Sequence, residues 1–315
     1  MNATAISNNS LQPESFFVTE SVQIIRGDVR QKLALLPDNT FHCCVTSPPY
    51  WGMRDYGYEG QIGAETNIND YIAHLVDVFR EVRRVLRSDG TFWLNIGNTY
   101  TSGGRTWRQS DAKNKGRAMS YRPDTPTGLK PKDLIGVAWM LAMALQLDGW
   151  YLRSDIIWHK PNCQPESVKD RVTVSHEYLF MLSKSENYYF DQESIKEQTA
   201  DGKSHKNKRT VWQINTEPCK EAHFAVFPRA LVRPCILAGA PKDGLVLDPF
   251  FGSGTVGVVA IEEGRGCVGV ELKSQYIEIA KQRLMAVTPP LKQNFAAEGQ
   301  TAKKREIYTN PSLNL

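Results

Sequence analysis

The chain has 315 residues and a net charge of +4, with 41% hydrophobic and 23% charged residues. This composition is typical of a folded globular protein and excludes a wholly disordered chain, a collagen-like repeat and a coiled-coil rod. No apolar run approaches the roughly 20 residues that a membrane-spanning helix needs, so we expect no membrane partner. The first fifteen residues also lack the basic start and apolar core of a secretory signal.

The six cysteines form no C-x-x-C pair, and the only close pair, Cys43 and Cys44, is adjacent in sequence. This spacing fits neither a zinc site nor a disulfide framework, so we expect no metal. Unpaired cysteines of this kind are typical of a reducing, cytoplasmic compartment.

The chain begins with a polar leader, residues 1–20, and then predicts an alternation of strands and helices. Apolar residues recurring at helical spacing predict a helix over 69–86. Short apolar runs predict strands at 21–25, 41–45, 91–96, 151–158 and 176–183. Further helices are predicted over 132–147 and 222–237.

Two stretches depart from this alternation because they are polar and basic. Residues 101–130 hold seven Lys or Arg against two Asp, with Gly, Ser and Pro throughout. Residues 196–210 form a second stretch of the same kind. Loops this long are usually functional, and a stripe of basic residues suits contact with nucleic-acid phosphates.

Near its end the chain predicts a βαβ unit that carries a glycine-rich turn. The unit has strands at 245–247 and 267–270, helices at 256–263 and 276–286, and is followed by a polar tail, 288–315. Gly252, Gly254 and Gly257 match G-x-G-x-x-G between strand and helix, and Glu271 closes the next strand. Such glycines let the backbone approach a ligand, and an acid at this distance can accept from two ribose hydroxyls. The pattern predicts a nucleoside-containing cofactor and leaves NAD open as an alternative.

A second constellation, Thr46-Ser47-Pro48-Pro49-Tyr50-Trp51, follows the strand predicted at 41–45. The two prolines fix the backbone and remove two N–H donors. What remains is a rigid row of acceptors, the Ser47 hydroxyl and the Pro48 carbonyl, beside an aromatic face. This arrangement suits an extruded nucleobase, whose ring stacks on Tyr50 while the acceptors bind its exocyclic amine.

Together, Ser47-Pro48-Pro49-Tyr50 and the segment 248–255, Asp-Pro-Phe-Phe-Gly-Ser-Gly-Thr, resemble the amino-methylating DNA methyltransferases that use S-adenosylmethionine. Blocks at 27–28, 36–38, 158–162 and 223–228 extend the resemblance from about residue 24 to residue 284. It implies a catalytic role for Ser47, Pro48, Pro49 and Tyr50. It also implies a cofactor site made of Asp28, Phe227, Asp248, Pro249, Phe250, Gly252, Ser253, Gly254, Thr255 and Glu271.

The catalytic block precedes the cofactor block, which is similar to the permuted, β-class arrangement of that family. The implied fold is α/β and Rossmann-like, with a mostly parallel sheet, one reversed edge strand and a small inserted recognition region. We expect one methyltransferase domain over 21–287, with a DNA-contacting loop at 101–130 and a recognition region at 163–215. The expected contacts to double-stranded DNA are Arg105, Arg108, Lys113, Lys115, Arg117, Arg122, Lys206, Lys208 and Arg209.

Serine at the first position of the catalytic block is typical of cytosine-N4 enzymes in that family, whereas Asp or Asn is typical of adenine-N6 enzymes. Ser47 therefore favours cytosine N4, with adenine N6 as the alternative. An NAD-dependent oxidoreductase is a distant alternative, because it would leave the Ser-Pro-Pro-Tyr block unexplained. The resemblance also implies a restriction endonuclease or a second copy of the chain as partners to be tested.

Overall fold

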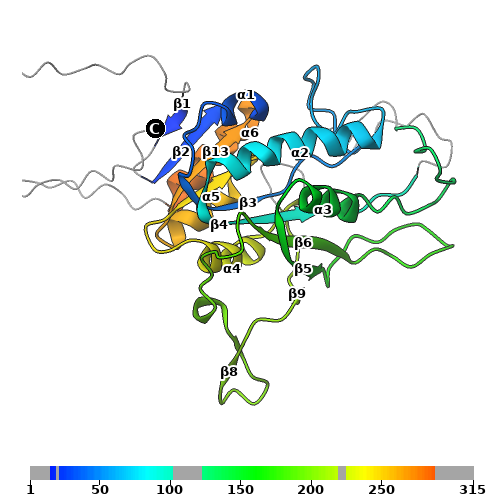
Figure 1. Ribbon diagram of the computed structural model, residues 1–315. Helices are drawn as coiled ribbons and strands as arrows, with labels where there is room; N and C mark the ends of the chain where they lie inside the picture. The colour runs from blue at the N-terminus through cyan, green and yellow to red at the C-terminus, as the bar shows by residue number, and fades with distance from the viewer. Residues whose placement is uncertain (1–14, 19–20, 102–122, 219–224, 288–315) are drawn as a thin grey trace, which may run out of the picture.

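The computed structural model describes residues 15–18, 21–101, 123–218 and 225–287 and contains a central nine-stranded sheet (Figure 1). In spatial order the strands are β1 (Ser15–Val18), β2 (Val22–Arg26), β13 (Gly266–Glu271), β12 (Leu245–Asp248), β3 (Phe41–Thr46), β4 (Leu86–Ile96), β6 (His176–Ser183), β5 (Tyr151–His159) and β9 (Val211–Gln213). All run in one direction except β1 and β6. The expected mostly parallel sheet with a reversed edge strand is confirmed, and a second reversed strand, β6, lies inside the sheet.

Helices cover both faces of this sheet, giving three layers. One face carries α1 (Val29–Leu33), α2 (Ile68–Val85) and α3 (Val137–Leu147), and the other carries α4 (Arg229–Gly239), α5 (Thr255–Glu262) and α6 (Ser274–Val287). Figure 1 shows α2 and α3 on the opposite side of the sheet from α4. Because both faces are buried, the central strands are almost continuously apolar.

Two helices begin later than predicted, and one helix was not predicted. α3 begins at Val137 instead of 132, because Lys132 and Gly136 both adopt a left-handed conformation, with φ of 75°. α4 begins at Arg229 instead of 222, after Pro228 at the N-cap, and residues 225–226 form a short strand, β11. The short helix α1 was not predicted; Asp28 caps it by accepting from the backbone N–H of Arg30.

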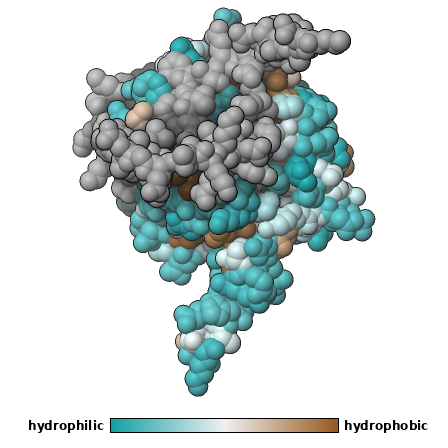
Figure 2. All heavy atoms as spheres, turned by 90° about the vertical axis from the view of Figure 1, so that its left-hand side faces the viewer, coloured by the Kyte–Doolittle hydropathy of each residue, from teal (hydrophilic) through white to brown (hydrophobic). Residues whose placement is uncertain are grey.

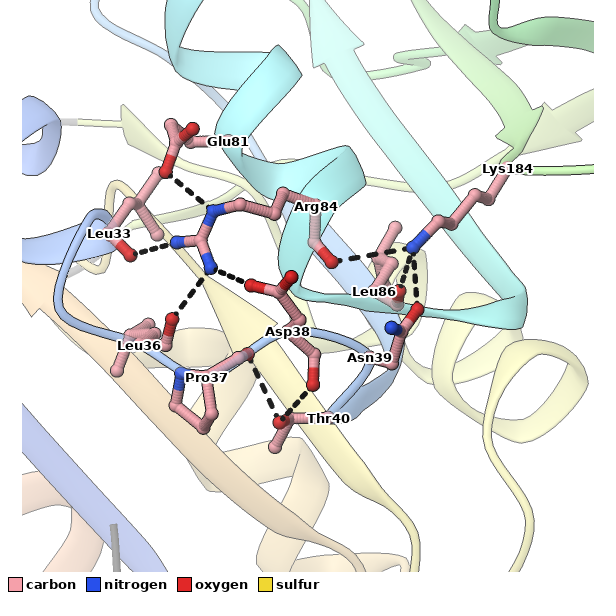
Figure 3. Close-up of polar contacts among 10 residues, drawn as sticks. All are labelled: Leu33, Leu36, Pro37, Asp38, Asn39, Thr40, Glu81, Arg84, Leu86 and Lys184. Carbon is pink, nitrogen blue, oxygen red and sulfur yellow. Dashed lines mark hydrogen bonds and ion pairs between the residues drawn. The ribbon is translucent and has the colours of Figure 1, made fainter.

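Two cations fix the end of α2, where the chain turns into β4 (Figure 3). Arg84 donates from its guanidinium to the carbonyls of Leu33 and Leu36, at 2.8 and 2.9 Å. Lys184 donates to the carbonyl of Leu86 at 2.5 Å, and burial lowers the pKa of its ammonium. Cations placed here satisfy carbonyl groups that a helix end leaves unpaired. They tie α2 to the loop before β3 and so fix the two strands that flank the catalytic block.

A polar arm projects away from the sheet beyond β6. It contains the 3-10 turn η2 (Glu193–Ile195) and the hairpin of β7 (Glu197–Gln198) and β8 (His205–Lys206). Figure 2 shows it as a hydrophilic protrusion from the body of the molecule. A second short hairpin pairs β10 (Glu217–Pro218) with β11 (Ala225–Val226).

Candidate active site

The site lies where the direction of the chain diverges between two neighbouring strands. β3 and β12 are adjacent and parallel, but β3 leads into α2 on one face whereas β12 leads into α5 on the other. Such a divergence leaves a crevice at the carboxyl ends of the strands, where open α/β sheets bind ligands. The two strand ends are joined by Thr46, whose hydroxyl donates to Asp248 Oδ1 at 2.6 Å.

A cavity of about 300 Å³ occupies this crevice and brings both sequence constellations together. Its lining includes the predicted catalytic residues Ser47, Pro48, Pro49 and Tyr50. It also includes the predicted cofactor residues Asp28, Phe227, Pro249, Phe250, Gly252, Ser253, Thr255 and Glu271. Asp248 and Gly254 do not line the cavity; they lie beneath and behind the glycine-rich turn.

Glu271 is the acidic group at one end of the cavity, which we term the cofactor end. Its two carboxylate oxygens accept from the backbone N–H groups of Gly252 and Lys273, each at 2.7 Å. A carboxylate has about four acceptor sites, so two remain for a ligand. Burial raises the pKa of Glu271 to about 7.

Asp248 is wholly buried directly below this turn. Its Oδ1 accepts from the Thr46 hydroxyl and from the backbone N–H of Phe250, at 2.6 and 3.1 Å. Its Oδ2 has no hydrogen-bond partner among the described residues, and burial raises its pKa to about 7. An unpaired buried carboxylate oxygen is costly, and protonation at the raised pKa lowers that cost.

The glycines of the turn serve two different purposes. Gly252 has a φ of +52° and lines the cavity, and a Cβ there would contact only the Phe250 carbonyl oxygen, at 3.8 Å, so this glycine is required by the backbone conformation and not by crowding. Gly257 instead makes room for Phe251, whose ring would lie 2.7 Å from an added Cβ, and Gly269 does the same from β13. Only part of the G-x-G-x-x-G pattern therefore faces a ligand.

Asp28 lies at the rim of the cofactor end. Its carboxylate pairs with the Arg30 guanidinium at 2.6 Å, and this contact lowers its pKa. Arg30 also donates to the carbonyl of Gly60 at 2.9 Å. Asp28 therefore ties the loop that closes the cavity to the start of α1.

The opposite end of the cavity, which we term the base end, is built around Tyr50. Its hydroxyl donates to Glu177 Oε2 at 2.8 Å, and burial raises its pKa well above the usual value. Glu177 Oε2 also accepts from the Asn95 side chain at 3.2 Å, while its Oε1 pairs with the Lys160 ammonium. Lys160 lies over the Trp158 ring, 4.3 Å from its centroid.

Sequence reasoning assigned no role to Asn95, Lys160 or Glu177. Lys160 belongs to the block at 158–162, but no motif of the sequence analysis included Glu177. Antiparallel pairing of β5 with β6 sets Trp158 opposite Glu177. The signal available in the sequence was that Lys160 follows the end of one predicted strand, 151–158, and that Glu177 lies at the start of the next, 176–183.

The loop after the catalytic block supplies a wall that was also missed. Met53, Arg54, Tyr56, Gln61 and Ile62 all line the cavity. The Gln61 side chain accepts from the backbone N–H of Tyr56 at 2.6 Å and donates to the carbonyl of Arg54 at 2.9 Å. These bonds shape the loop into a fixed wall.

Of the expected DNA contacts, six fall in 102–122, outside the described residues: Arg105, Arg108, Lys113, Lys115, Arg117 and Arg122. The other three lie on or beside the polar arm. Lys208 pairs with Glu197 at 3.1 Å and lies 4.8 Å from the Trp212 ring centroid. The Arg209 side chain is 75% exposed, and Lys206 ends β8.

Within the described ranges, no helix is long and apolar enough to cross a membrane. The same residues contain no group of three or more His, Cys, Asp or Glu side chains able to hold a metal ion. Cys43, Cys44, Cys235 and Cys267 are buried, and burial raises the pKa of each thiol.

The sheet is open and mostly parallel, and it carries a glycine turn and an acid near the point where β3 and β12 lead to opposite faces. Solved structures of methyltransferases share this Rossmann-like fold. The PvuII DNA methyltransferase, described as cytosine-N4-specific, matches with a TM-score of 0.64 and 22% identity over 84% of this chain and 86% of that chain. A putative DNA modification methylase from Thermus thermophilus, TTHA0409, solved with S-adenosyl-L-methionine, matches with a TM-score of 0.57 and 24% identity over 85% and 96%.

The family follows from sequence. The model of the DNA methylase family, which comprises N6 and N4 methyltransferases, matches residues 41–282. The type II methyltransferase M.SmaI of Serratia marcescens is 67% identical over 84% of this chain and 91% of its own length. M.Cfr9I of Citrobacter freundii is 55% identical over 88% and 94%. The chain belongs to the DNA methylase family and is a DNA amino-methyltransferase with S-adenosylmethionine as its cofactor. The predicted family is confirmed, and the NAD-dependent alternative is set aside.

Proposed function

We propose that this protein transfers a methyl group to the N4 amine of a cytosine that is turned out of double-stranded DNA. One observation carries the proposal. A single cavity is lined both by the Ser47-Pro48-Pro49-Tyr50 loop and by Glu271, and the two strands that carry them are joined by the hydrogen bond from Thr46 to Asp248. A base and a methyl donor can therefore meet inside one shielded space.

The cofactor would be held by the turn between β12 and α5. Glu271 keeps two acceptor sites for ribose hydroxyls, and Phe250, Phe227 and Pro249 supply apolar surface. Asp248 lies outside the lining and supports this turn from below, through the Thr46 hydroxyl and the backbone N–H of Phe250. Gly252, Ser253 and Thr255 border the same space, Gly254 starts α5, and Asp28 lies at the rim. When bound, the cofactor supplies an electrophilic methyl on a sulfonium centre.

At the base end, the chain would orient the target amine. The Ser47 hydroxyl and the Pro48 carbonyl accept its two N–H bonds, and Tyr50 stacks on the ring. The lone pair of an exocyclic amine is delocalised into its ring. Accepting both N–H bonds would favour the pyramidal form, whose lone pair would be free to form the new N–C bond while the methyl–sulfur bond breaks and its electron pair stays on the sulfur, leaving a neutral thioether. The alkylated amine then loses a proton to solvent. Positioning and preorganised acceptors supply most of the acceleration.

The choice of cytosine rests on Ser47, the residue at the first position of the catalytic block. The test is to express the protein, isolate DNA from the same cells, digest it to nucleosides and identify the methylated base by mass spectrometry. N4-methylcytosine is the expected product. N6-methyladenine in its place would reject the cytosine assignment while leaving amine methylation intact. A Ser47→Ala variant serves as the matched control and should lower the yield.

Further parts of the proposal concern the DNA and its partners. Lys206 and Arg209 lie on or beside the polar arm, within the proposed recognition region 163–215. M.SmaI and M.Cfr9I are type II methyltransferases, so a cognate restriction endonuclease is a natural partner to seek. A homodimer is a further proposal, which sedimentation of the purified protein would test.

A further inference from the structure

Glu177 is the hub of the base end, and no role assigned above uses it. Its carboxylate receives three donors: the Tyr50 hydroxyl, the Asn95 amide and the Lys160 ammonium. The donors come from three separate parts of the chain, the loop after β3, strand β4 and the residue after β5. A single side chain thus joins three segments at one wall of the cavity.

The backbone at Gly97 brings Glu177 and Tyr50 into close apposition. A Cβ at this position would lie 3.1 Å from Tyr50 Cε2 and 3.2 Å from Glu177 Cγ. Both distances are tighter than ordinary van der Waals contact, so any side chain here would push the two apart. The Tyr50 ring is therefore fixed by its hydroxyl bond and also by contact along its edge.

The charges in this network are balanced within it. The Glu177 and Lys160 side chains are only 19% and 17% exposed, and they pair with each other. A half-buried carboxylate needs such a partner because burial penalises an isolated charge. With its charge paired and both oxygens accepting hydrogen bonds, Glu177 is suited to hold geometry. Tyr50 remains the protonated donor, because burial raises its pKa.

We infer that Glu177 is a positioning residue for methyl transfer, which fixes the Tyr50 ring as the platform for the target base and holds the Lys160 ammonium at the same end of the cavity. The inference rests on the proposed role of Tyr50 as that platform. It assigns Glu177 an effect on the rate of transfer and none on cofactor binding, because the cofactor end is built from other residues.

The direct test is Glu177→Gln, which keeps the shape but replaces one acceptor oxygen with an N–H₂ group facing donors. Rates are measured as transfer of labelled methyl groups from S-adenosylmethionine to DNA, whichever base receives them. We expect kcat to fall about tenfold or more, as a misplaced reacting group costs, with cofactor affinity close to wild type. Tm should fall as well, because the Lys160 ammonium loses its charged partner. Glu262→Gln is the matched control, since Glu262 pairs with Arg229 and Arg233 at 2.6 Å outside the cavity lining, and its kcat should not change.

A double-mutant cycle separates positioning from a merely structural role. In a Tyr50→Phe background, where the hydroxyl bond is already gone, Glu177→Gln should cost much less than in the wild type. Gly97→Ala gives an independent route, because its added methyl displaces the same two side chains without changing charge, and it should reproduce the fall in kcat. It also keeps the test decisive if Glu177→Gln fails to fold.

Three results would overturn the inference: wild-type kcat in Glu177→Gln, equal losses in both backgrounds of the cycle, or wild-type kcat in Gly97→Ala. Failure of the underlying proposal is recognised separately. If Tyr50→Ala transfers methyl groups at the wild-type rate, the role of Tyr50 itself is wrong. If Tyr50→Ala is impaired but Glu177→Gln is not, only the role of Glu177 is rejected.

Discussion

The two ends of the cavity hold their acidic groups in different ways. At the cofactor end, Glu271 accepts from two backbone N–H groups, one of which belongs to a residue only two positions away. At the base end, Glu177 accepts from side chains, and its partner Tyr50 lies 127 positions away in sequence. Backbone donors are fixed by the turn itself and survive substitution of side chains. Side-chain donors can be altered one at a time, so the base end is the part of the site that substitution can tune.

Charge is handled differently as well. Glu177 is paired with Lys160, whereas burial raises the pKa of both Glu271 and Asp248 to about 7. The cofactor end therefore stores unfavourable electrostatic energy in the folded protein. A ligand that brings donors to Glu271, the one of the two that lines the cavity, would relieve part of it. At the cofactor end a buried carboxylate can therefore gain hydrogen bonds from a ligand, whereas at the base end the Glu177 carboxylate is already paired within the protein.

The largest effect is expected from Tyr50→Ala, which removes the aromatic platform of the base end. Stacking of one base on an aromatic side chain is worth ~1–3 kcal/mol, and loss of positioning adds to it, so methyl transfer should fall about a hundredfold or more. Cofactor affinity should stay at the wild-type value, because the cofactor end does not use Tyr50. Methyl-transfer kinetics and calorimetry with S-adenosylmethionine measure the two quantities.

Two further variants control this experiment. Tyr58→Ala removes a tyrosine that is 40% exposed and lies outside the cavity lining, and it should leave both quantities unchanged. Tyr50→Phe keeps the ring but loses the bond to Glu177, so its rate should lie between wild type and Tyr50→Ala. A Tyr50→Ala variant that loses stability, cofactor binding and activity together would show that Tyr50 serves only the fold.

The next effect concerns the cofactor end. Glu271→Ala removes a charged acceptor, and losing such a bond costs ~1.5–3 kcal/mol, or about tenfold to a hundredfold in affinity for S-adenosylmethionine. Glu278→Ala, which removes a 57% exposed carboxylate on α6, should bind normally. Calorimetry on both folded variants gives the comparison. Equal affinities would remove Glu271 from the cofactor site.

A third prediction addresses the electrostatic energy of Asp248. Its pKa is about 7 in the folded protein against a usual 3.8, so the folded state binds the proton more strongly between these values. The free energy of unfolding should therefore fall as pH rises from about 4 to 7. The side chain of Asp248→Asn does not titrate, so the variant should lose less stability than wild type between pH 5 and pH 8. The difference should be a few kcal/mol, because a shift of one pKa unit corresponds to about 1.4 kcal/mol.

Denaturant unfolding of both proteins at several pH values measures this difference. The comparison between variant and wild type cancels the contribution of other titrating groups. Parallel pH profiles would mean that Asp248 stays ionised in the folded protein, and the contrast between the two ends would then rest on Glu271 alone.

The smallest effect is expected on the polar arm. Arg209→Ala should weaken binding to all DNA sequences alike, and the slope of log affinity against log salt should become shallower by about 0.9 per lost phosphate contact. Lys208→Ala is the informative counterpart. Both side chains pair with Glu197, but Lys208 does so at 3.1 Å, is only 18% exposed and packs on Trp212, whereas Arg209 lies at 3.9 Å and is 75% exposed. Lys208→Ala should leave the salt slope as it is. An unchanged slope in Arg209→Ala would mean that this exposed side chain does not touch DNA.

Sequence patterns predicted seven of the nine sheet strands, because burial on both faces makes most of them apolar runs. They missed β1 and β9, and they placed the start of β4 at 91 instead of Leu86. β6 was predicted with its observed bounds, 176–183. The starts of α3 and α4 were wrong, since left-handed residues at 132 and 136 and a strand at 225–226 interrupt segments whose composition is helical. Periodicity reports which face is buried, but it does not report the backbone conformation of individual residues.

By itself the sequence determined the cofactor end of this protein. Strand, glycine turn, helix and acid follow one another within a single βαβ unit, so their spacing already fixes their geometry. At the base end the sequence predicted the Ser47–Tyr50 loop, and only the tertiary structure decided its surroundings. Tyr50, Asn95 and Lys160 converge on Glu177 because β6 enters the sheet in reverse between β4 and β5, and no local pattern encodes that pairing. The same is true of Thr46 and Asp248, 202 positions apart, which meet because their strands end side by side.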